Sequence, residues 1–142
     1  MQAMTNNSNI QARSLLFFSL FIFWGFGYET VVKRLTTVVV GVVVSSRDIP
    51  STGAPRYATD YIIRGIDGVI RGYIAGPTDA SPPRSMPVRT RIKKLRWELN
   101  YERDAAQVRD FPVAFYSAIL GMALSFFVRG LLLLRRWRGK SA

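Results

Sequence analysis

The side chains of this chain that could do chemistry are carboxylates, serines and lysines, because the sequence contains neither histidine nor cysteine. That absence removes the commonest general base, the thiolate nucleophile and the usual zinc ligands. Serine–lysine catalysis needs a serine beside a buried lysine, whereas Lys93 and Lys94 fall in a stretch that we expect to be a charged strand. The carboxylates that could pair for glycosidase-type chemistry are expected at surface or helix-cap positions: Glu98, Glu102, Asp104 and Asp110.

Glycines that could cradle a phosphate group also lack the right context. A phosphate-binding loop follows a strand and opens a helix, whereas Gly65, Gly68 and Gly72 fall in a predicted hairpin. The sequence therefore predicts a protein that is not an enzyme, with no cofactor and no metal site.

Interaction surfaces are the remaining candidates, and the first is a proline-rich loop at residues 76–89. Proline lacks an N–H donor and fixes φ, so we expect this loop to be extended and to lie outside the sheet. A rigid loop loses little entropy on binding, which makes it a candidate docking segment; the alternative is a crossover along the sheet edge. The residues that we single out are Thr78, Asp79, Pro82, Pro83 and Arg84.

The second candidate is a stripe of small side chains in the apolar stretch at residues 111–134. Ser117, Gly121 and Ser125 recur every four residues. Small residues let membrane helices approach closely. The stripe therefore predicts helix packing, either against the first apolar helix through Gly25, or against a second copy or another membrane subunit.

The third candidate is the basic tail. The net charge of +11 would by itself suggest nucleic acid or anionic lipid as a partner. Four cations, Arg135, Arg136, Arg138 and Lys140, directly follow the second apolar stretch. We expect them to contact lipid headgroups and to set the topology of the chain, with no nucleic-acid partner.

Two apolar stretches, at residues 14–28 and 111–134, must position these groups, and every acidic side chain lies between them. The second would be about 36 Å long as a helix, enough to cross a hydrocarbon core of about 30 Å. Arg129 lies near its end and could snorkel to the headgroups. We expect Asp110 to be its N-cap and Pro112 to lie in its first turn.

The first stretch is shorter, about 22 Å as a helix, so a crossing must begin near Ile10 or continue across Glu29 to Val32. We predict an uncleaved transmembrane helix over residues 14–32, with Trp24 and Tyr28 in an interfacial aromatic belt. A signal peptide is the alternative, but no small-x-small cleavage site follows this stretch.

The flanking charges predict the orientation and the domain organisation. Arg13 and the basic tail place both termini in the cytoplasm by the positive-inside rule. The predicted order is a cytoplasmic tail (residues 1–13), a first span (14–32), an extracytoplasmic β-rich domain (33–110), a second span (111–134) and a basic cytoplasmic tail (135–142). The predicted location is the bacterial inner membrane.

The middle domain is predicted to be an antiparallel meander of four or five strands. The valine-rich residues 35–45 predict a long strand with a bulge or bend at Gly41, and residues 46–55 predict a loop. Alternating side chains at residues 57–64 predict a strand that returns over residues 69–74 as a hairpin, in which Asp67 and Gly68 would form a type I′ turn.

A further long strand is predicted at residues 91–101, because its side chains alternate between apolar and polar. After it, residues 103–106 should turn the chain into a short strand that ends near Arg109. In the predicted strand one face carries Leu95, Trp97, Leu99 and Tyr101, and the other carries Lys94, Arg96, Glu98 and Asn100.

These features together resemble an uncharacterised bacterial family of small membrane proteins with a β-rich extracytoplasmic domain between two spans. The resemblance rests on a Gly-x-Val strand at Gly41, a tyrosine-rich strand that ends before Asp67-Gly68, and a basic strand that ends at Tyr101. That family has a glycine in the turn before the basic strand, where this chain has Arg89. The resemblance implies a fold and assigns no catalytic residues.

The sequence thus predicts a non-enzymatic integral membrane protein with two transmembrane helices flanking a small antiparallel β-meander. We expect an accessory or structural subunit of an envelope complex that uses its β-domain and second helix to bind other membrane proteins or its own copies. The alternative is a membrane-active, holin-like phage protein, which shares the small size and basic tail. Such proteins usually lack a folded loop of this length.

Overall fold

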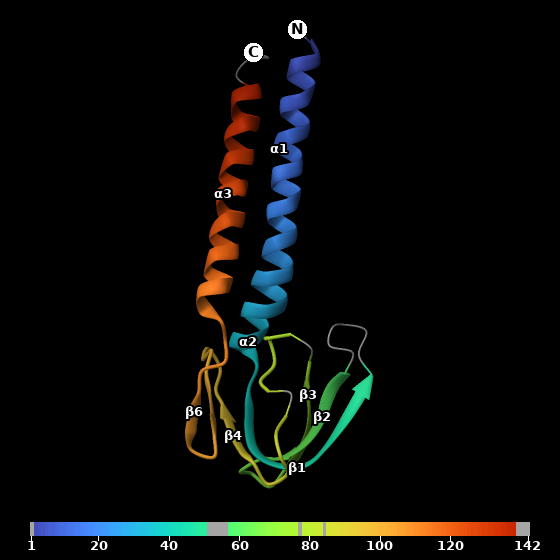
Figure 1. Cartoon of the computed structure of the whole chain (residues 1–142), viewed down its shortest axis with the longest axis vertical. Coiled ribbons are helices and arrows are strands. Elements are labelled where there is room, and N and C mark those ends of the chain that lie inside the picture. The colour runs from blue at the N-terminus through green and yellow to red at the C-terminus, as the bar shows by residue number, and fades with distance from the viewer. Residues whose placement is uncertain (1, 51–56, 77, 84, 139–142) are drawn as a thin grey trace. The chain divides into compact units, whose positions relative to one another are not determined.

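The computed structural model describes residues 2–50, 57–76, 78–83 and 85–138 of the chain. It contains two compact units, one formed by Met1–Glu29 with Pro112–Ala142 and the other by Thr30–Phe111. The first unit is a pair of helices and the second is a sheet domain (Figure 1). Two long apolar helices therefore flank an antiparallel sheet, as the sequence predicts.

The helix pair consists of α1 (Gln2–Ile22), which continues into the π-helical segment η1 (Phe23–Val32), and of α3 (Val113–Arg138). The two helices run antiparallel, because Gly130 approaches Leu16 while Gly27 approaches Leu120 (Figure 1). By length and composition, Asn9–Thr36 and Val113–Arg136 could each cross a membrane. The first candidate span is thus longer than the predicted residues 14–32 at both ends.

Small residues let these helices approach closely, although the large side chains Ile22 and Tyr116 are buried as well. Ala12 and Ser19 on α1 are buried, as is Ala123 on α3. A Cβ atom at Gly130 would lie 2.9 Å from the Leu16 side chain, so only glycine fits there without a shift. Ala12 and Ser19 are seven residues apart, as are Ala123 and Gly130, which is the repeat of a left-handed helix pair.

Helix α3 begins at Val113, two residues after the start that an N-cap at Asp110 would give, so Pro112 does not lie in its first turn as predicted. The Tyr116 N–H donates to the Pro112 carbonyl at 3.2 Å, so Pro112 precedes the first helical residue. The prediction that Asp110 is the N-cap is wrong, because its carboxylate pairs with Arg34 instead.

The sheet has six strands, all paired antiparallel, in the order β3-β2-β1-β4-β5-β6. The strands are β1 (Val39–Pro50), β2 (Tyr57–Arg64), β3 (Ile70–Ala75), β4 (Arg91–Lys94), β5 (Tyr101–Arg103) and β6 (Ala106–Val108). The predicted four- or five-stranded meander is therefore wrong in strand number and in order. The chain leaves β3 at one edge and returns beside β1, so two three-stranded meanders share one sheet.

Strand β1 lies at the junction of these meanders and differs from its predicted bounds. Residues 33–36 form a helical turn, α2 (Lys33–Thr36), while residues 46–50, predicted as loop, continue the strand. The bulge falls between Val43 and Ser45 rather than at Gly41. Gly41 is required for another reason: a Cβ there would lie 2.3 Å from the Arg64 carbonyl oxygen.

The β2–β3 hairpin forms where it was predicted but with a different turn. Gly68 has a φ of 77°, whereas Asp67 does not have a positive φ, so the turn is not type I′. The Gly68 N–H donates to the Gly65 carbonyl at 3.0 Å, and the Asp67 carboxylate accepts from the Arg71 guanidinium. This ion pair lowers the pKa of Asp67.

The single long strand predicted at residues 91–101 is broken after Lys94. The Trp97 N–H donates to the Leu35 carbonyl at 2.6 Å, and Trp97 has a φ of 69°. Leu95 and Trp97, predicted to share an apolar face, are therefore exposed, while Lys94 is buried. A two-residue turn with positive φ at Asp104 and Ala105 then joins β5 to β6.

One face of the sheet, called here the inner face, carries the core. Its buried side chains come from every strand from β1 to β5 and from the crossover between β3 and β4. The Tyr61 hydroxyl donates to the Pro83 carbonyl and accepts from the Met86 N–H, so the crossover packs over this face. The core residues are Val39, Val43, Tyr61, Ile63, Ala75, Met86, Ile92 and Tyr101.

Candidate functional site

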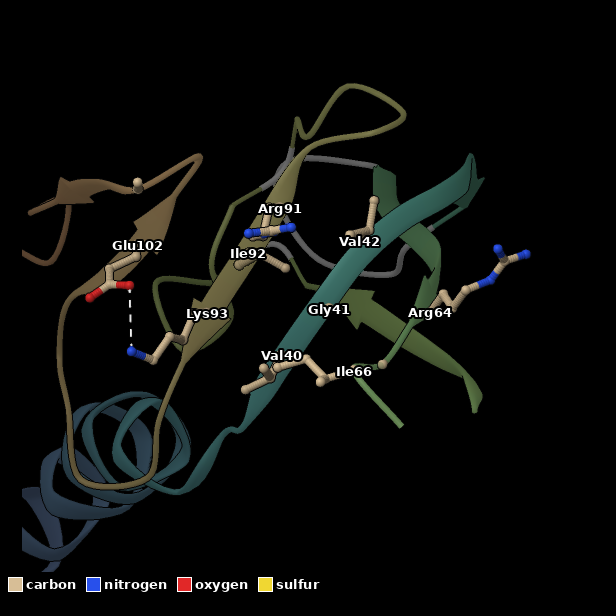
Figure 2. A pocket seen from close by; sticks show the side chains of 11 residues that line it. Val40, Gly41, Val42, Arg64, Ile66, Arg91, Ile92, Lys93 and Glu102 are labelled. Carbon is tan, nitrogen blue, oxygen red and sulfur yellow. Dashed lines mark ion pairs between the residues drawn. The ribbon is translucent and has the colours of Figure 1, made fainter. Parts of the chain in front are cut away.

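An open groove lies across the middle of the sheet domain and has a volume of about 530 Å³. Strand β1 forms its floor, and the end of β2, strand β4 and Glu102 of β5 form its sides (Figure 2). The groove is thus built from segments that lie far apart in the sequence and meet only through strand pairing.

The register of the sheet explains which side chains reach the groove. Side chains alternate between the two faces of a strand, so Val40 and Val42 point away from the core that holds Val39 and Val43. Val42 has Arg64 as its partner on β2 and Arg91 as its partner on β4. Two arginines from neighbouring strands therefore flank one valine. We call this side of the sheet the outer face.

The groove carries an excess of positive charge. Lys93 and Glu102 form an ion pair of 3.6 Å beside Val40, and both side chains are half exposed. Arg64 and Arg91 are exposed, and within the described part of the chain neither forms an ion pair. The groove therefore presents two unneutralised guanidinium groups beside apolar side chains.

The outer face continues from the groove over β2 and β3 as an apolar surface. Ile62, Ile70 and Ile74 are 40%, 57% and 56% exposed, and Ile66 at the groove is 91% exposed. No element in the described ranges covers them. The two faces of one sheet therefore differ, since the crossover covers only the inner one.

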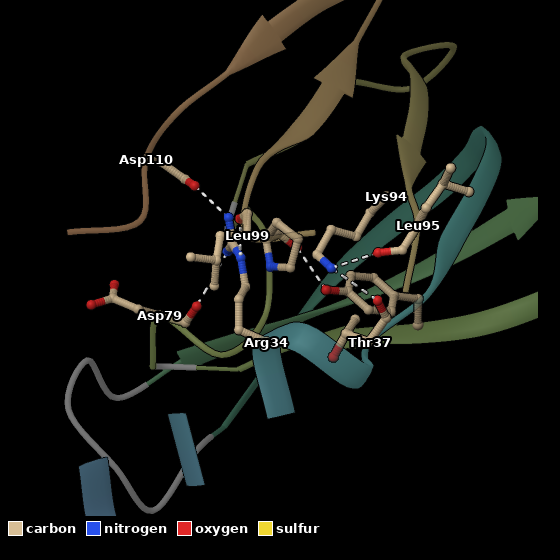
Figure 3. Close-up of polar contacts among 9 residues, drawn as sticks. Arg34, Thr37, Asp79, Lys94, Leu95, Leu99 and Asp110 are labelled. Carbon is tan, nitrogen blue, oxygen red and sulfur yellow. Dashed lines mark hydrogen bonds and ion pairs between the residues drawn. The ribbon is translucent and has the colours of Figure 1, made fainter. Parts of the chain in front are cut away.

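Arg34 organises the interior of the sheet domain. Its guanidinium donates to the Leu99 carbonyl at 2.8 Å, to the Asp79 carbonyl at 3.2 Å and to the Asp110 carboxylate (Figure 3). It also lies over the rings of Tyr101 and Phe111. One buried cation thus joins α2 to the crossover, to the turn before β5 and to the end of the domain.

Lys94 is a second buried cation, and it lies close to the first. Its ammonium donates to the Thr37 carbonyl at 3.1 Å and to the Leu95 carbonyl at 2.9 Å (Figure 3). Burial lowers the pKa of Lys94, the charge of Arg34 acts in the same direction, and Glu98 opposes them. The sequence did not predict a buried lysine of the kind that a serine–lysine mechanism needs, yet Lys94 is buried. Its ammonium group, however, donates hydrogen bonds to two backbone carbonyls.

Three tyrosines lie in or against the core of the sheet domain, and Tyr101 lies against Arg34. Burial raises the pKa of Tyr101 to about 12, with the Asp110 carboxylate contributing. Burial also raises the pKa values of Tyr61 and Tyr73 above the usual value. All three hydroxyls are thus held protonated at neutral pH. Among the described residues, no group of three or more carboxylates is placed to hold a metal ion.

The proline-rich loop is divided by its packing. Thr78 and Asp79 have exposed side chains, whereas Pro82 is fully buried. The carbonyls of Pro82 and Pro83 accept hydrogen bonds from Tyr73 and Tyr61. The docking surface predicted for this loop is therefore open to a partner at Thr78 and Asp79 but not at Pro82, while Arg84 lies outside the described residues.

The small-residue stripe of α3 does not face α1. Ser117, Gly121 and Ser125 are all exposed, and a Cβ at Gly121 would meet no atom within 4 Å. A Cβ at Gly25 would also meet none, so the proposed contact with the first helix through Gly25 does not form. Packing of this stripe against a different helix stays a prediction.

The basic tail is described in part. Arg135 and Arg136 are exposed near the C-terminal end of α3, and Arg138 is the last residue of the helix. The side chain of Arg138 and the whole of Lys140 lie outside the described residues. Their contact with lipid stays a prediction.

The residues that sequence reasoning missed are Arg34, Lys94, Arg64 and Arg91. Lys94 points inward because it lies two residues after the buried Ile92 on the same face of β4. Arg64 and Arg91 did carry a signal, because each ends or begins a strand at an outward position. Their meeting across Val42 required the pairing of β1 with both β2 and β4.

Comparison of the chain with protein-family models, with curated proteins and with solved structures gives no match. The function of the chain therefore has to follow from its own residues.

Proposed function

We propose that this chain is a non-enzymatic integral membrane protein whose sheet domain binds another protein, as an accessory subunit of an envelope complex. The observation that carries this proposal is the uncovered outer face of the sheet. Exposed isoleucines on three neighbouring segments form one apolar surface beside Arg64 and Arg91, which form no ion pair among the described residues. Contiguous apolar surfaces with a charged border are typical of protein interaction sites.

The surface of the helix pair supports the membrane location. Phe17 and Phe21 on α1 are 72% and 64% exposed, and Leu124 on α3 is 54% exposed. The helices of a water-soluble protein bury such side chains in a core, whereas helices in a bilayer present them to lipid. Lipid around the helix pair would account for both the exposed apolar side chains and the length of the helices.

The charges at the ends of the helices support an orientation. Arg13, Arg135 and Arg136 lie at the same end of the antiparallel pair. In a bacterial inner membrane the positive-inside rule would put this end in the cytoplasm. The sheet domain would then be extracytoplasmic.

The exposed stripe of α3 supplies a second surface for assembly. Gly121 lies between Ser117 and Ser125 on a side of the helix that α1 leaves open. Another membrane helix could approach closely there, from a second copy or from a different subunit. The sheet domain would bind outside the membrane and α3 within it.

Site-specific photocrosslinking tests the proposed function. A photoreactive residue would replace Ile74 on the outer face, and the matched control would replace the exposed Ser46, which points to the inner side of β1. The full-length protein would be expressed at native level in its own host, then extracted in mild detergent. We expect a protein adduct of defined mass from Ile74 and none from Ser46.

The opposite results would redirect the proposal. If neither position gives a protein adduct and the extracted protein is a bare monomer, the subunit role is wrong. If overexpression collapses the membrane potential in the same cells, the holin-like alternative replaces it.

A further inference from the structure

The groove has one arginine on each side of its floor, and among the described residues neither arginine forms an ion pair. Arg64 and Arg91 are the cross-strand partners of Val42 on its two sides. Neighbouring strands lie about 4.8 Å apart, so the Cα atoms of the two arginines are separated by about 10 Å across the sheet. Long, flexible arginine side chains that start at this separation can both reach an anionic group lying over Val42.

We propose that the groove binds an acidic, extended segment of a partner protein, whose carboxylates pair with Arg64 and Arg91 while an apolar side chain covers Val40 and Val42. This inference rests on the proposed function, because it names the chemistry of the partner at the same sheet face. Arginine suits this role, since its planar guanidinium binds a carboxylate through two parallel hydrogen bonds.

The dimensions of an extended chain fit the groove. In a strand, alternate side chains lie on one face about 7 Å apart, so two carboxylates at positions i and i+2 could reach the two flexible arginines. A volume of about 530 Å³ accommodates several side chains. The apolar floor of Val40 and Val42, with Ile66 at the side, would then take the rest of the segment.

The pair formed by Lys93 and Glu102 gives the groove a direction. These side chains lie beside Val40, at the opposite end of the floor from Val42 and its arginines. An acidic side chain placed near Glu102 would be repelled. The bound segment should therefore carry its carboxylates over Val42 and a neutral or basic side chain near Glu102.

Charge and shape favour a foreign protein over the other possible occupants. A second copy of this chain would bring its own Arg64 and Arg91 against the same charges, and the chain as a whole carries +11. A bilayer surface is flat, whereas the valine floor is recessed and has Glu102 at its side. A small anion would leave uncovered the isoleucines that extend the surface over β2 and β3.

The test uses the full-length protein in its own host with a photoreactive residue at Ile66, which lies at the groove. Adduct formation would be measured with native arginines and in the double variant Arg64→Gln/Arg91→Gln. The matched control is Arg103→Gln, which removes an exposed charge whose strand partner, Ile92, belongs to the inner face. Unchanged melting temperatures in detergent would show that all variants fold.

We expect the double variant to reduce the yield of the protein adduct at least about tenfold and Arg103→Gln to leave it unchanged. Mass spectrometry of the adduct should find aspartate or glutamate within a few residues of the crosslinked position. Raising the salt concentration before illumination should lower the yield for the native arginines and leave the double variant unaffected.

The outcomes separate this inference from the proposed function. An undiminished protein adduct in the double variant would overturn the acidic segment while the subunit role stands. Adducts with the mass of a phospholipid, or of two copies of this chain, would overturn it in favour of those occupants. Absence of any protein adduct at both Ile66 and Ile74 would remove the proposed function itself.

Discussion

The two units of this chain bury opposite kinds of side chain. The sheet domain encloses charged groups, with Arg34 and Lys94 at 1% and 0% exposure, inside a shell of tyrosines and aliphatic residues. The helix pair encloses small residues such as Ala12 and Ala123 and leaves large apolar side chains such as Phe17 and Phe21 exposed. The sheet domain relies on specific hydrogen bonds to its buried charges, whereas the helix pair relies on the close approach of two helix backbones.

This is the difference expected if the sheet domain lies in water and the helix pair lies in a bilayer, as proposed. In water, apolar burial stabilises a domain, and any charge taken inside must find partners, as Arg34 does. In hydrocarbon there is no such drive between helices, because lipid is as apolar as their side chains. Helices then associate where glycine and alanine let their backbones come close, as at Gly130.

The largest expected effect comes from removing the buried guanidinium. Arg34→Met would leave the Asp110 carboxylate and the Leu99 and Asp79 carbonyls without their donor. We expect the free energy of unfolding of the sheet domain to fall by about 3–5 kcal/mol, as for other broken buried ion pairs. Urea unfolding of the full chain in detergent, followed by tryptophan fluorescence, measures it.

The matched control for this change is Arg47→Met, because Arg47 is an exposed arginine on β1. Its replacement should change the stability by less than about 0.5 kcal/mol. If the two variants lose the same amount of unfolding free energy, the interior of the sheet domain does not depend on Arg34.

The second prediction concerns alkaline pH. The folded pKa of Tyr101 is raised to about 12, above the unfolded value of about 10. The protonated Tyr101 hydroxyl therefore contributes fully to the stability of the folded state below about pH 10. This contribution, up to about 3 kcal/mol, is lost as the pH rises through 12. The unfolding free energy, measured from pH 8 to 12, should fall steeply above 10, and less steeply in Tyr101→Phe.

Lys94 contributes to the same profile with the opposite sign. Its folded pKa is lowered, so the unfolded chain binds the extra proton between that value and about 10.4. Stability should therefore rise with pH in this window. Lys94→Met should abolish the rise and keep the alkaline loss; a rise that persists in this variant would contradict the assignment to Lys94.

The third prediction compares the two sides of α3. Gly130→Leu would force a side chain against Leu16 and should destabilise the helix pair by about 1–3 kcal/mol. Gly121→Leu enters open space and should leave the melting temperature of the detergent-solubilised monomer unchanged. If Gly121→Leu is the more damaging of the two, the helices pack through the other side of α3.

Local patterns in the sequence predicted the elements that depend on local physics. The uninterrupted apolar run at residues 111–134 led to α3, and the alternation at residues 57–64 led to β2. The continuation of β4 through Leu95 failed, because the Leu35 carbonyl takes the Trp97 N–H and bends the chain there. That contact joins residues 62 positions apart in the sequence, so no local periodicity predicts it.

The candidate site was less predictable than the elements around it. The outward positions of Arg64 and Arg91 follow from the alternation of side chains along a strand. Both arginines lie beside Val42 only because β4 pairs with β1, whereas a simple meander would pair β4 with β3. The helix contact had a readable signal in the seven-residue spacing of Ala123 and Gly130. The four-residue stripe at Gly121, which was predicted to be the packing surface, lies on the exposed side of α3.

The smallest expected effect concerns Arg89, in the turn before β4. Arg89 has a φ of 77°, a conformation that costs a residue with a Cβ about 1 kcal/mol, and its N–H donates to the Val43 carbonyl at 2.8 Å. Arg89→Gly should therefore raise the unfolding free energy of the sheet domain by up to about 1 kcal/mol, less the entropy that glycine adds to the unfolded chain. The neighbouring Val88→Gly, where φ is not positive, should lower it by about 0.5–1 kcal/mol. Parallel urea titrations of the two variants measure both changes, and a loss of stability in both would show that the turn does not favour glycine at residue 89.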